Sequence, residues 1–187
     1  MQKFKLAGIA AISLVFSAAP AQAHLAVGAQ APVFATKGAK AGKEVLFDLK
    51  QALKRGPVVL YFYPKAFTQG CTLEARAFAE ATPEFAKFGA TVIGLSVDDL
   101  PTLKKFSTEE CRDRFTVGIA APGIIKDYDV ALKRTGVPAG MTDRTSYVID
   151  QNGRIALVHS DLDYRDHVKL TLAAVKELAK HKGHAGH

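Results

Sequence analysis

The 187-residue chain has no tryptophan and only two cysteines, Cys71 and Cys111. No cluster of cysteine and histidine accompanies them, which excludes a structural zinc site of the usual kind. The apolar stretch from Leu6 to Phe16 is too short to be a lasting membrane anchor. The formal charge is +7, but the basic residues are scattered, without a stripe of interleaved aromatic residues. We therefore expect a solvated basic surface and no nucleic-acid binding.

The first 23 residues have the pattern of a secretory signal peptide. Lys3 and Lys5 form a basic start, the apolar core follows, and Ala21 and Ala23 supply the small residues that a signal peptidase requires. Cleavage would leave residues 24–187, enough for a single domain, and would lower the charge to +5. We predict an exported, periplasmic protein, with an uncleaved signal as the alternative. Disulfides form in an oxidising compartment, so every hypothesis has to consider a Cys71–Cys111 disulfide, whether structural or catalytic.

The run from Val58 to Glu80 carries most of the information in the chain. Its first six residues, through Tyr63, are apolar or aromatic, which is typical of a strand buried on both faces. Pro64 ends the strand, and a short loop leads into an Ala-rich segment with helical spacing, so Cys71 is predicted at a helix N-terminus. Free backbone N–H groups and the helix dipole there favour a thiolate. Thr68 can place its hydroxyl beside the sulfur, either as the helix cap or as a donor to the thiolate.

Hydrophobic periodicity predicts the remaining elements. We expect an extended lead-in over 24–44, and Pro83 predicts a kink or break in the Cys71 helix. The clearest signal is a hairpin with its turn at 151–153. The predicted strands are 45–49, 91–97, 117–120, 145–150 and 154–159, and the predicted helices are 49–54, 103–113, 124–132 and 164–181.

The pattern Pro64-x-x-x-Thr68-x-x-Cys71 resembles the active-site signature of the peroxiredoxins. The longer run from Phe62 to Ala75 resembles their Q-type subfamily, the bacterioferritin comigratory proteins, and the resemblance covers roughly residues 28–181. It implies an α/β, thioredoxin-like fold with a central mixed β-sheet flanked by helices, which agrees with the predicted order of elements. It also implies a thiol peroxidase that needs no cofactor.

The resemblance assigns a role to each residue of the signature. The Cys71 thiolate would attack the terminal oxygen of a hydroperoxide and become a sulfenic acid. Charge on the departing oxygen would be stabilised by the amides of Gly70 and Cys71, by the Thr68 hydroxyl, and by Arg144, which stands before a predicted strand as the family's arginine does. Pro64 would fix the turn that aims Thr68 and Cys71.

Two further residues are predicted to support the site. Glu74, one turn after Cys71, is expected to be structural, with an orienting role toward Thr68 or Arg144 as the alternative. Tyr63 is a candidate for the pocket lining, although buried tyrosines are common.

The resolving thiol departs from the best-known Q-type pattern. Many relatives carry a second cysteine five residues after the first, where this chain has Arg76. Cys111 lies 111 − 71 = 40 residues after Cys71, on the next predicted helix, and we expect it to attack the sulfenic acid. The alternatives are a bystander Cys111, with an external thiol as resolver, or a bridge between subunits.

The resemblance also predicts what the protein binds and how it assembles. The expected partners are a hydroperoxide and thioredoxin or another dithiol, and Q-type resemblance implies a monomer or weak homodimer.

Two other functions on the same fold need a second cysteine near Cys71. A thiol-disulfide oxidoreductase would need Cys-x-x-Cys, but Glu74 occupies the position of its second cysteine, and a copper-delivery protein would need a cysteine where this chain has Ala75. A non-enzymatic module with a permanent Cys71–Cys111 bridge stays open. No metal site is expected, and the tail histidines are read as incidental: His181, His184 and His187.

Overall fold

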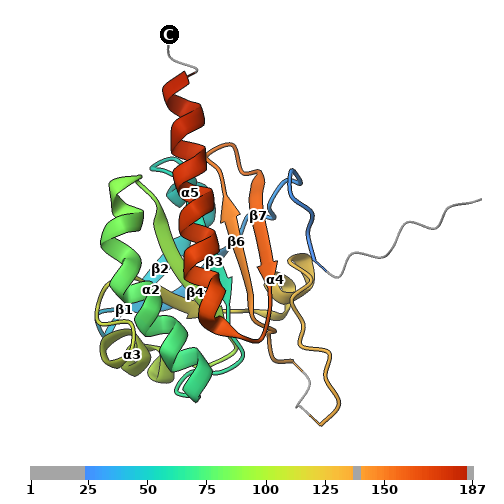
Figure 1. The fold of residues 1–187 in the computed structure, drawn as a ribbon. Coiled ribbons are helices and arrows are strands. Elements are labelled where there is room, and N and C mark those ends of the chain that lie inside the picture. Colours follow the sequence, from blue (N-terminus) through green and yellow to red (C-terminus); the bar gives the residue numbers. More distant parts are fainter. Residues whose placement is uncertain (1–23, 137–139, 185–187) are drawn as a thin grey trace, which may run out of the picture.

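The computed structural model describes residues 24–136 and 140–184, with the backbone alone for 182–184 (Figure 1). The predicted signal peptide and His187 lie outside the described residues. Within them, one seven-stranded mixed sheet has the order β2-β1-β5-β4-β3-β6-β7. The strands are β1 Ala35–Lys40, β2 Lys43–Asp48, β3 Val58–Phe62, β4 Thr91–Ser96, β5 Thr116–Ile119, β6 Thr145–Ile149 and β7 Ile155–Ser160. The predicted α/β fold with a central mixed sheet is confirmed.

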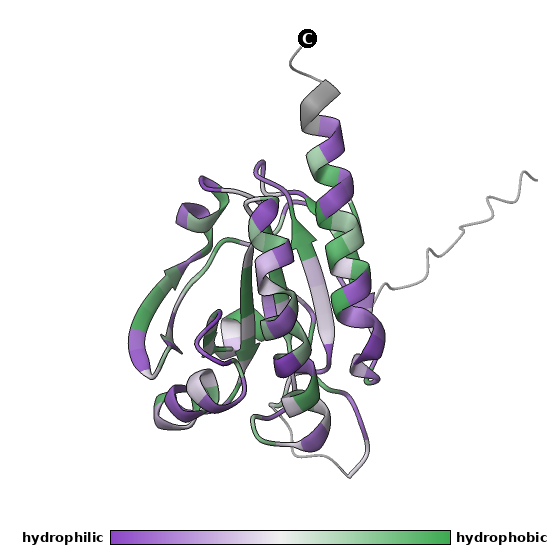
Figure 2. Cartoon of the chain, turned by 60° about the vertical axis from the view of Figure 1, so that its left-hand side comes forward, coloured by the Kyte–Doolittle hydropathy of each residue, from purple (hydrophilic) through white to green (hydrophobic). Residues whose placement is uncertain are grey.

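The helices form a layer on each face of the sheet. One hydrophobic cluster joins the sheet to α2 (Gln69–Lys87), α3 (Leu100–Glu109) and α5 (His167–His184). A second cluster, on the opposite face, packs α1 (Leu49–Leu53) and α4 (Pro122–Asp127). A 3₁₀ turn, η1 (Tyr164–Asp166), precedes α5. Figure 2 shows the expected pattern: the strands are largely hydrophobic, and hydrophobic and hydrophilic residues alternate along the helices.

Strand β3 lies at the centre of the sheet and positions the site. All five of its residues are buried, as predicted for a strand covered on both faces. It pairs in parallel with β4 and antiparallel with β6, so that Phe62 faces Leu95 on one side and Thr145 on the other. The segment after β3 therefore lies beside the residue that precedes β6, which is Arg144.

The extended lead-in predicted over 24–44 is wrong for its second half, because β1 and β2 form a hairpin there. Ala41 and Gly42 make the turn with positive φ angles of 51° and 72°. Gly38 lets β1 approach β5 closely, since a Cβ there would lie 2.3 Å from the Val117 carbonyl oxygen. The predicted strand 45–49 corresponds to β2. Strand β1 was not predicted, because alanine, glycine and lysine carry little strand signal.

Three helix predictions also need correction. Helix α2 continues through Pro83, so the predicted break is wrong, while the alternative of a kink stays a prediction. Packing of its second half, where Phe85 is fully buried, offsets the cost of the proline. Helix α3 ends at Glu109, so Cys111 lies in the turn beyond it and not on the helix. Helix α4 ends at Asp127, because the chain turns at Asp129, which has a φ of 48°.

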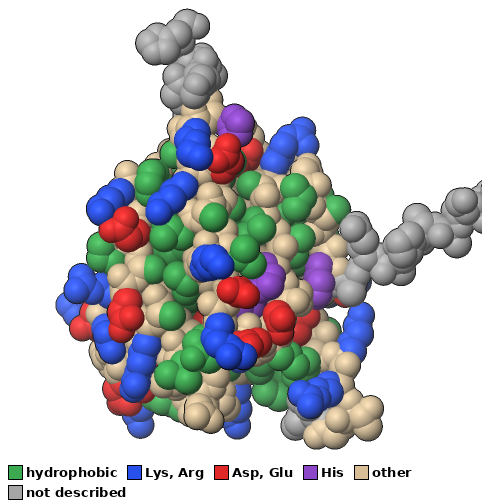
Figure 3. Space-filling view, viewed as in Figure 1, with side chains coloured by type: hydrophobic (Ala, Val, Ile, Leu, Met, Phe, Trp, Pro, Cys, Tyr) green, Lys and Arg blue, Asp and Glu red, His purple; other side chains and the backbone are tan. Residues whose placement is uncertain are grey.

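In residues 24–136 and 140–184, no helix is both long and apolar enough to cross a membrane. On the face shown in Figure 3, lysine and arginine side chains alternate with acidic ones and form no continuous stripe.

Candidate active site

Cys71 is the third residue of α2 and is 1% exposed. It lies at the helix N-terminus, as predicted, because β3 ends at Phe62 and the loop from Tyr63 to Thr68 turns the chain into the helix. Amides in the first turn of a helix have no carbonyl in a preceding turn to which they can donate. The sulfur is therefore placed where backbone donors and the helix dipole favour negative charge.

Arg144 contacts both Cys71 and Glu74 on α2. Its Nη2 donates to Cys71 Sγ at 3.5 Å, and its Nη1 is hydrogen-bonded to Glu74 Oε2. Its Nε donates to the Leu162 carbonyl at 2.9 Å, so three acceptors fix the guanidinium. Arg144 is 5% exposed and Glu74 is 0% exposed. The structure thus favours the orienting role that the sequence left as the alternative for Glu74.

Gly70 makes room for this cation. A Cβ at residue 70 would lie 3.2 Å from Arg144 Nη2, tighter than ordinary van der Waals contact. The guanidinium therefore rests against the helix backbone beside the sulfur. Burial raises the pKa of Glu74 to about 8, although the positive charge and hydrogen bond of Arg144 act to lower it.

Thr68 occupies the N-cap position but does not cap the helix with its side chain. Its exposed hydroxyl donates to the Lys65 carbonyl oxygen at 2.9 Å instead. The predicted side-chain cap is therefore wrong, and its predicted role as a donor toward the thiolate stays a prediction. Pro64 directly follows Tyr63 at the start of this loop, where the sequence placed it. Phe67 has a φ of 61°, which aims the chain into α2.

The sequence did not identify the residues that anchor this loop. Asp98 Oδ2 accepts from the Ala66 amide at 2.7 Å and from Ser96 Oγ at 2.8 Å. The Tyr63 carbonyl accepts from Thr142 Oγ1 at 2.7 Å. The available signal was the acidic pair Asp98-Asp99, which follows the buried strand β4 closely.

Tyr63 is fully buried in the core and stacks on Phe106 at 5.5 Å between ring centroids. Its hydroxyl has no hydrogen-bond partner among the described residues. Burial, followed by the charge of Cys111, raises the pKa of Tyr63 well above its ordinary value. It therefore packs within the core cluster that also holds both cysteines.

Cys111 is a free thiol, as is Cys71, and both are buried in that one cluster. Burial, and then the charges of Glu110 and Asp113, raise the pKa of the Cys111 thiol well above its ordinary value. Arg76, which stands where many Q-type relatives have cysteine, instead pairs with Glu110 at 2.6 Å. A second ion pair, Arg112 to Glu80 at 3.1 Å, also ties the turn to α2.

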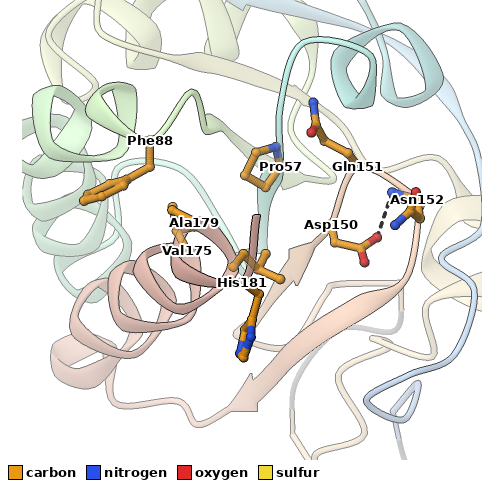
Figure 4. Close-up of a pocket in the computed structure, with 9 residues that line it drawn as sticks. Pro57, Phe88, Asp150, Gln151, Asn152, Val175, Ala179 and His181 are labelled. Carbon is orange, nitrogen blue, oxygen red and sulfur yellow. Dashed lines mark hydrogen bonds between the residues drawn. The ribbon is translucent and has the colours of Figure 1, made fainter. Parts of the chain in front are cut away.

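A cavity at the opposite end of β3 is lined by Pro57, Phe88, Val175 and the hairpin turn (Figure 4). Its volume is about 400 Å³. The Asp150 carboxylate beside it accepts from the amides of Asn152 and Arg154. His181, at its edge, lies 3.3 Å from Glu177. No three potential metal-binding side chains cluster anywhere in the part of the chain that the structure describes.

Comparison with known proteins adds an independent line of evidence. The AhpC/TSA family matches residues 27–158. The chain is 33% identical over 157 residues to the chloroplastic peroxiredoxin Q of Suaeda salsa, covering 83% of this chain and 70% of that protein. It is 35% identical over 144 residues to peroxiredoxin Q of Gentiana triflora, covering 74% of this chain and 61% of the relative.

Solved structures agree. Peroxidoxin BcpB from Mycobacterium tuberculosis aligns with a TM-score of 0.73 at 29% identity, over 82% of this chain and 98% of that one. Peroxiredoxin Q from Xanthomonas campestris aligns with a TM-score of 0.66 at 25% identity, over 76% and 90% of the two chains. The chain therefore belongs to the AhpC/TSA family, and within it to the peroxiredoxins of the Q type.

Proposed function

We propose that this peroxiredoxin reduces hydrogen peroxide and organic hydroperoxides at Cys71. The thiolate sulfur attacks the terminal oxygen of the hydroperoxide, an S–O bond forms, and the O–O bond breaks. Cys71 becomes a sulfenic acid, and the departing alkoxide or hydroxide takes up a proton to give alcohol or water. Organic peroxides are included because the Xanthomonas campestris bacterioferritin comigratory protein, of similar fold, has alkyl peroxide reduction activity.

One observation supports this chemistry above the others. The Arg144 guanidinium contacts Cys71 Sγ at 3.5 Å and is bound to the buried Glu74. A fixed cation at that distance stabilises the thiolate, and it stabilises the negative charge that develops on the departing oxygen. In a site from which water is largely excluded, such a contact is worth more than it would be in bulk water.

The test is rapid mixing of the reduced protein with one equivalent of hydrogen peroxide, followed by mass spectrometry. We expect loss of the Cys71 thiol within seconds and a sulfenic acid that dimedone can trap. Cys71→Ser removes the reaction, whereas Cys111→Ser, the matched control, retains it. A parent protein whose thiols survive, or that contains a permanent disulfide, would contradict the proposal and favour an oxidoreductase or a binding module.

We propose that Cys111 resolves the sulfenic acid. Its sulfur attacks the Cys71 sulfur, water leaves, and a Cys71–Cys111 disulfide forms, which thioredoxin or a similar dithiol reduces by exchange. The location of both thiols in one core cluster supports this pairing. Cys111 is fully buried, so we expect its turn to move before an external dithiol can reach the disulfide. If Cys111→Ser turns over with thioredoxin at the full rate, an external thiol is the resolver.

We further propose that the protein is exported to the periplasm after removal of residues 1–23, and that it is a monomer or weak homodimer. The N-terminal sequence pattern supports the first statement, and resemblance to the Q-type supports the second. N-terminal sequencing of the secreted product tests the cleavage, and equilibrium sedimentation of its reduced and oxidised forms tests the assembly. A stable intersubunit disulfide would show instead that Cys111 bridges two copies.

A further inference from the structure

The loop from Tyr63 to Thr68, which leads from β3 into α2, contains a strained residue. Phe67 has a φ of 61°, in the left-handed region that residues other than glycine rarely adopt. Thr68, directly after it, has extended backbone angles, and α2 begins at Gln69. A rotation about the N–Cα bond of Phe67 would turn the chain that follows, including Cys71. Contacts around the loop must therefore hold this angle.

Two side chains restrain the loop next to Phe67. Asp98 Oδ2 accepts from the Ala66 amide, one residue before Phe67, at 2.7 Å. The same oxygen accepts at 2.8 Å from the hydroxyl of Ser96, a fully buried residue at the end of β4, so the carboxylate is fixed to the sheet. The Phe106 ring contacts the Phe67 ring with centroids 5.2 Å apart. Because Phe67 is 42% exposed, this packing covers only part of it, and the charge-assisted bond from Asp98 is the stronger restraint.

The distance between the Cys71 sulfur and its cation depends on where the first turn of α2 is placed. That turn starts from the loop, since the Thr72 amide donates to the Thr68 carbonyl at 2.9 Å. The cation comes from other elements: Arg144 precedes β6, and the carbonyl that binds its Nε belongs to Leu162, after β7. A loop that relaxed at Phe67 would therefore move the sulfur relative to the guanidinium, which now lies 3.5 Å away.

We propose that Asp98 is a positioning residue for the reaction at Cys71. Its carboxylate holds the Ala66 amide, which keeps Phe67 in the left-handed conformation, and the first turn of α2 then presents the sulfur to Arg144. Asp98 acts through the backbone of the loop. Without its hydrogen bond, Phe67 relaxes toward negative φ and the sulfur loses its alignment with the cation. This inference rests on the proposed hydroperoxide reduction at Cys71.

Two substitutions of Asp98 separate its hydrogen bond from its charge. Asp98→Ala removes the acceptor, and we expect the rate of Cys71 oxidation by hydrogen peroxide at pH 7 to fall about tenfold, because the reacting groups are misaligned. Asp98→Asn loses the charge but keeps a carbonyl oxygen that can accept from the Ala66 amide. Its rate should stay within about threefold of the parent.

Phe67→Gly tests the role of the strained angle directly. Glycine adopts positive φ about as readily as negative φ, so a glycine at this position no longer needs the restraint. We expect Phe67→Gly alone, and Asp98→Ala combined with Phe67→Gly, to react within about threefold of the parent. A purely structural role of Asp98 predicts the opposite, because Phe67→Gly also removes the ring contact with Phe106 and should add to the damage.

The measurement is stopped-flow reaction of each protein with two reagents. Every protein, the parent included, carries Cys111→Ser, so that Cys71 is the one thiol in the chain. Iodoacetamide alkylates the thiolate without a departing oxygen, whereas hydrogen peroxide also needs the cation at its departing oxygen. The ratio of the peroxide rate to the alkylation rate therefore reports the alignment of sulfur and guanidinium. It should fall in Asp98→Ala and stay parental in Asp98→Asn.

Asp99→Ala is the matched control. Asp99 is the neighbouring carboxylate, and it caps α3 by accepting from the Thr102 amide at 2.9 Å. Its replacement removes the same charge and also a helix cap, but it leaves the loop anchored, so the ratio should stay parental. Should Asp98→Ala fail to fold, Ser96→Ala tests the same point. It removes the hydrogen bond that fixes the carboxylate to β4, and the ratio should fall about threefold.

Several outcomes would overturn the proposal. A parental ratio in Asp98→Ala, or in Ser96→Ala where that variant replaces it, shows that the loop needs no such anchor. An Asp98→Asn variant as slow as Asp98→Ala shows that the charge acts and not the hydrogen bond. Equal losses in Asp98→Ala and Asp99→Ala, or a double variant with Phe67→Gly that is slower still, leave Asp98 with a structural role alone. Failure of the proposed function looks different, because the parent itself would then not react with peroxide.

Discussion

At the scale of single residues, the site depends on how closely the Arg144 guanidinium can approach the sulfur. Gly70 permits the approach, since a Cβ there would lie 3.2 Å from Nη2. Glu74 holds the other end of the guanidinium, and the Leu162 carbonyl holds Nε. A change of a few tenths of an ångström at any of these contacts moves the cation relative to Cys71.

Gly70→Ala should separate stability from activity. Gly70 has no positive φ in the structure and lies in a helix, so alanine there should raise the free energy of unfolding by about 0.5–1 kcal/mol. The added methyl group pushes the guanidinium away, and we expect peroxide reduction to slow about tenfold. Urea unfolding and stopped-flow oxidation of the same preparation check both statements. A variant that is more stable and equally fast would show that the contact has no catalytic value.

Arg144→Lys should slow peroxide reduction strongly, although the positive charge is retained. An ammonium group cannot contact Glu74, Cys71 and the Leu162 carbonyl from one plane as the guanidinium does. We expect a loss of about 100-fold in the rate with hydrogen peroxide. The loss with iodoacetamide should be smaller, because alkylation has no charged departing oxygen of this kind. Arg165→Lys, at an exposed arginine that pairs with Asp163, is the control.

The motif predicted Cys71, Arg144, Glu74 and Gly70 because their chemistry is visible in residue types and spacing. It did not predict His167, Ser146 or Asp98, since these matter only through tertiary contacts. In the last helix the fully buried residues are His167, Thr171 and Val175, and of these only Val175 is an apolar residue that hydrophobic periodicity can identify as a core position. A rotation of one residue about the helix axis decides whether His167 faces solvent or Glu74.

At the scale of elements, the turn after α3 controls access to Cys111. Arg112 and Asp113 both have positive φ angles, 49° and 60°, which costs energy for residues other than glycine. The Arg76–Glu110 and Arg112–Glu80 ion pairs hold this turn against α2. The turn is therefore a strained segment held by contacts that are themselves partly exposed.

Breaking the Arg76–Glu110 pair should speed formation of the Cys71–Cys111 disulfide. Arg76 is partly exposed, so the pair contributes at most about 1 kcal/mol, and we expect Arg76→Gln to accelerate disulfide formation about twofold to fivefold after a peroxide pulse. Quenched alkylation followed by mass spectrometry measures the rate. Glu84→Gln, which breaks an exposed pair within the same helix, should leave it unchanged. A slower rate in Arg76→Gln would show that the pair assists the reaction.

Elements with strong local signals were predicted well. Strand β3 and the β6–β7 hairpin lie where the sequence placed them, because apolar runs and the Asn152-Gly153 turn determine them locally. Strand β2 corresponds to the predicted strand 45–49, but β1 was missed, since its Ala, Gly and Lys residues carry little strand signal and become a strand by pairing with β2 and β5. The end of α3 was also missed, because a left-handed turn of non-glycine residues has no sequence signal.

At the scale of the whole molecule, protonation of buried groups makes stability depend on pH. The pKa of His167 falls from 6.5 to about 4 on folding, so the neutral ring is the form that the fold favours. Its contribution is complete above pH 6.5 and is lost as pH falls toward 4. Glu74 acts in the opposite direction. Because its pKa is raised on folding, its contribution to stability is complete below about pH 4.5 and is lost as the pH rises toward 8.

His167→Gln should remove the acid-side dependence. Between pH 6.5 and 4 the parent should lose up to roughly 3 kcal/mol of unfolding free energy through this group, and the variant should lose less by that amount. Urea titrations across this range, with the two proteins compared at each pH, give the difference. If the two curves stay parallel, His167 titrates alike in the folded and unfolded chains.

Both sulfurs lie within the cluster that fastens α2 and α3 to the sheet, with the stacked rings of Tyr63 and Phe106 in the same cluster. A catalytic cycle that passes through a Cys71–Cys111 disulfide must therefore open this part of the interior and close it again. We expect the oxidised protein to be the looser of the two forms, so that susceptibility to a protease at the α3 turn would report the redox state.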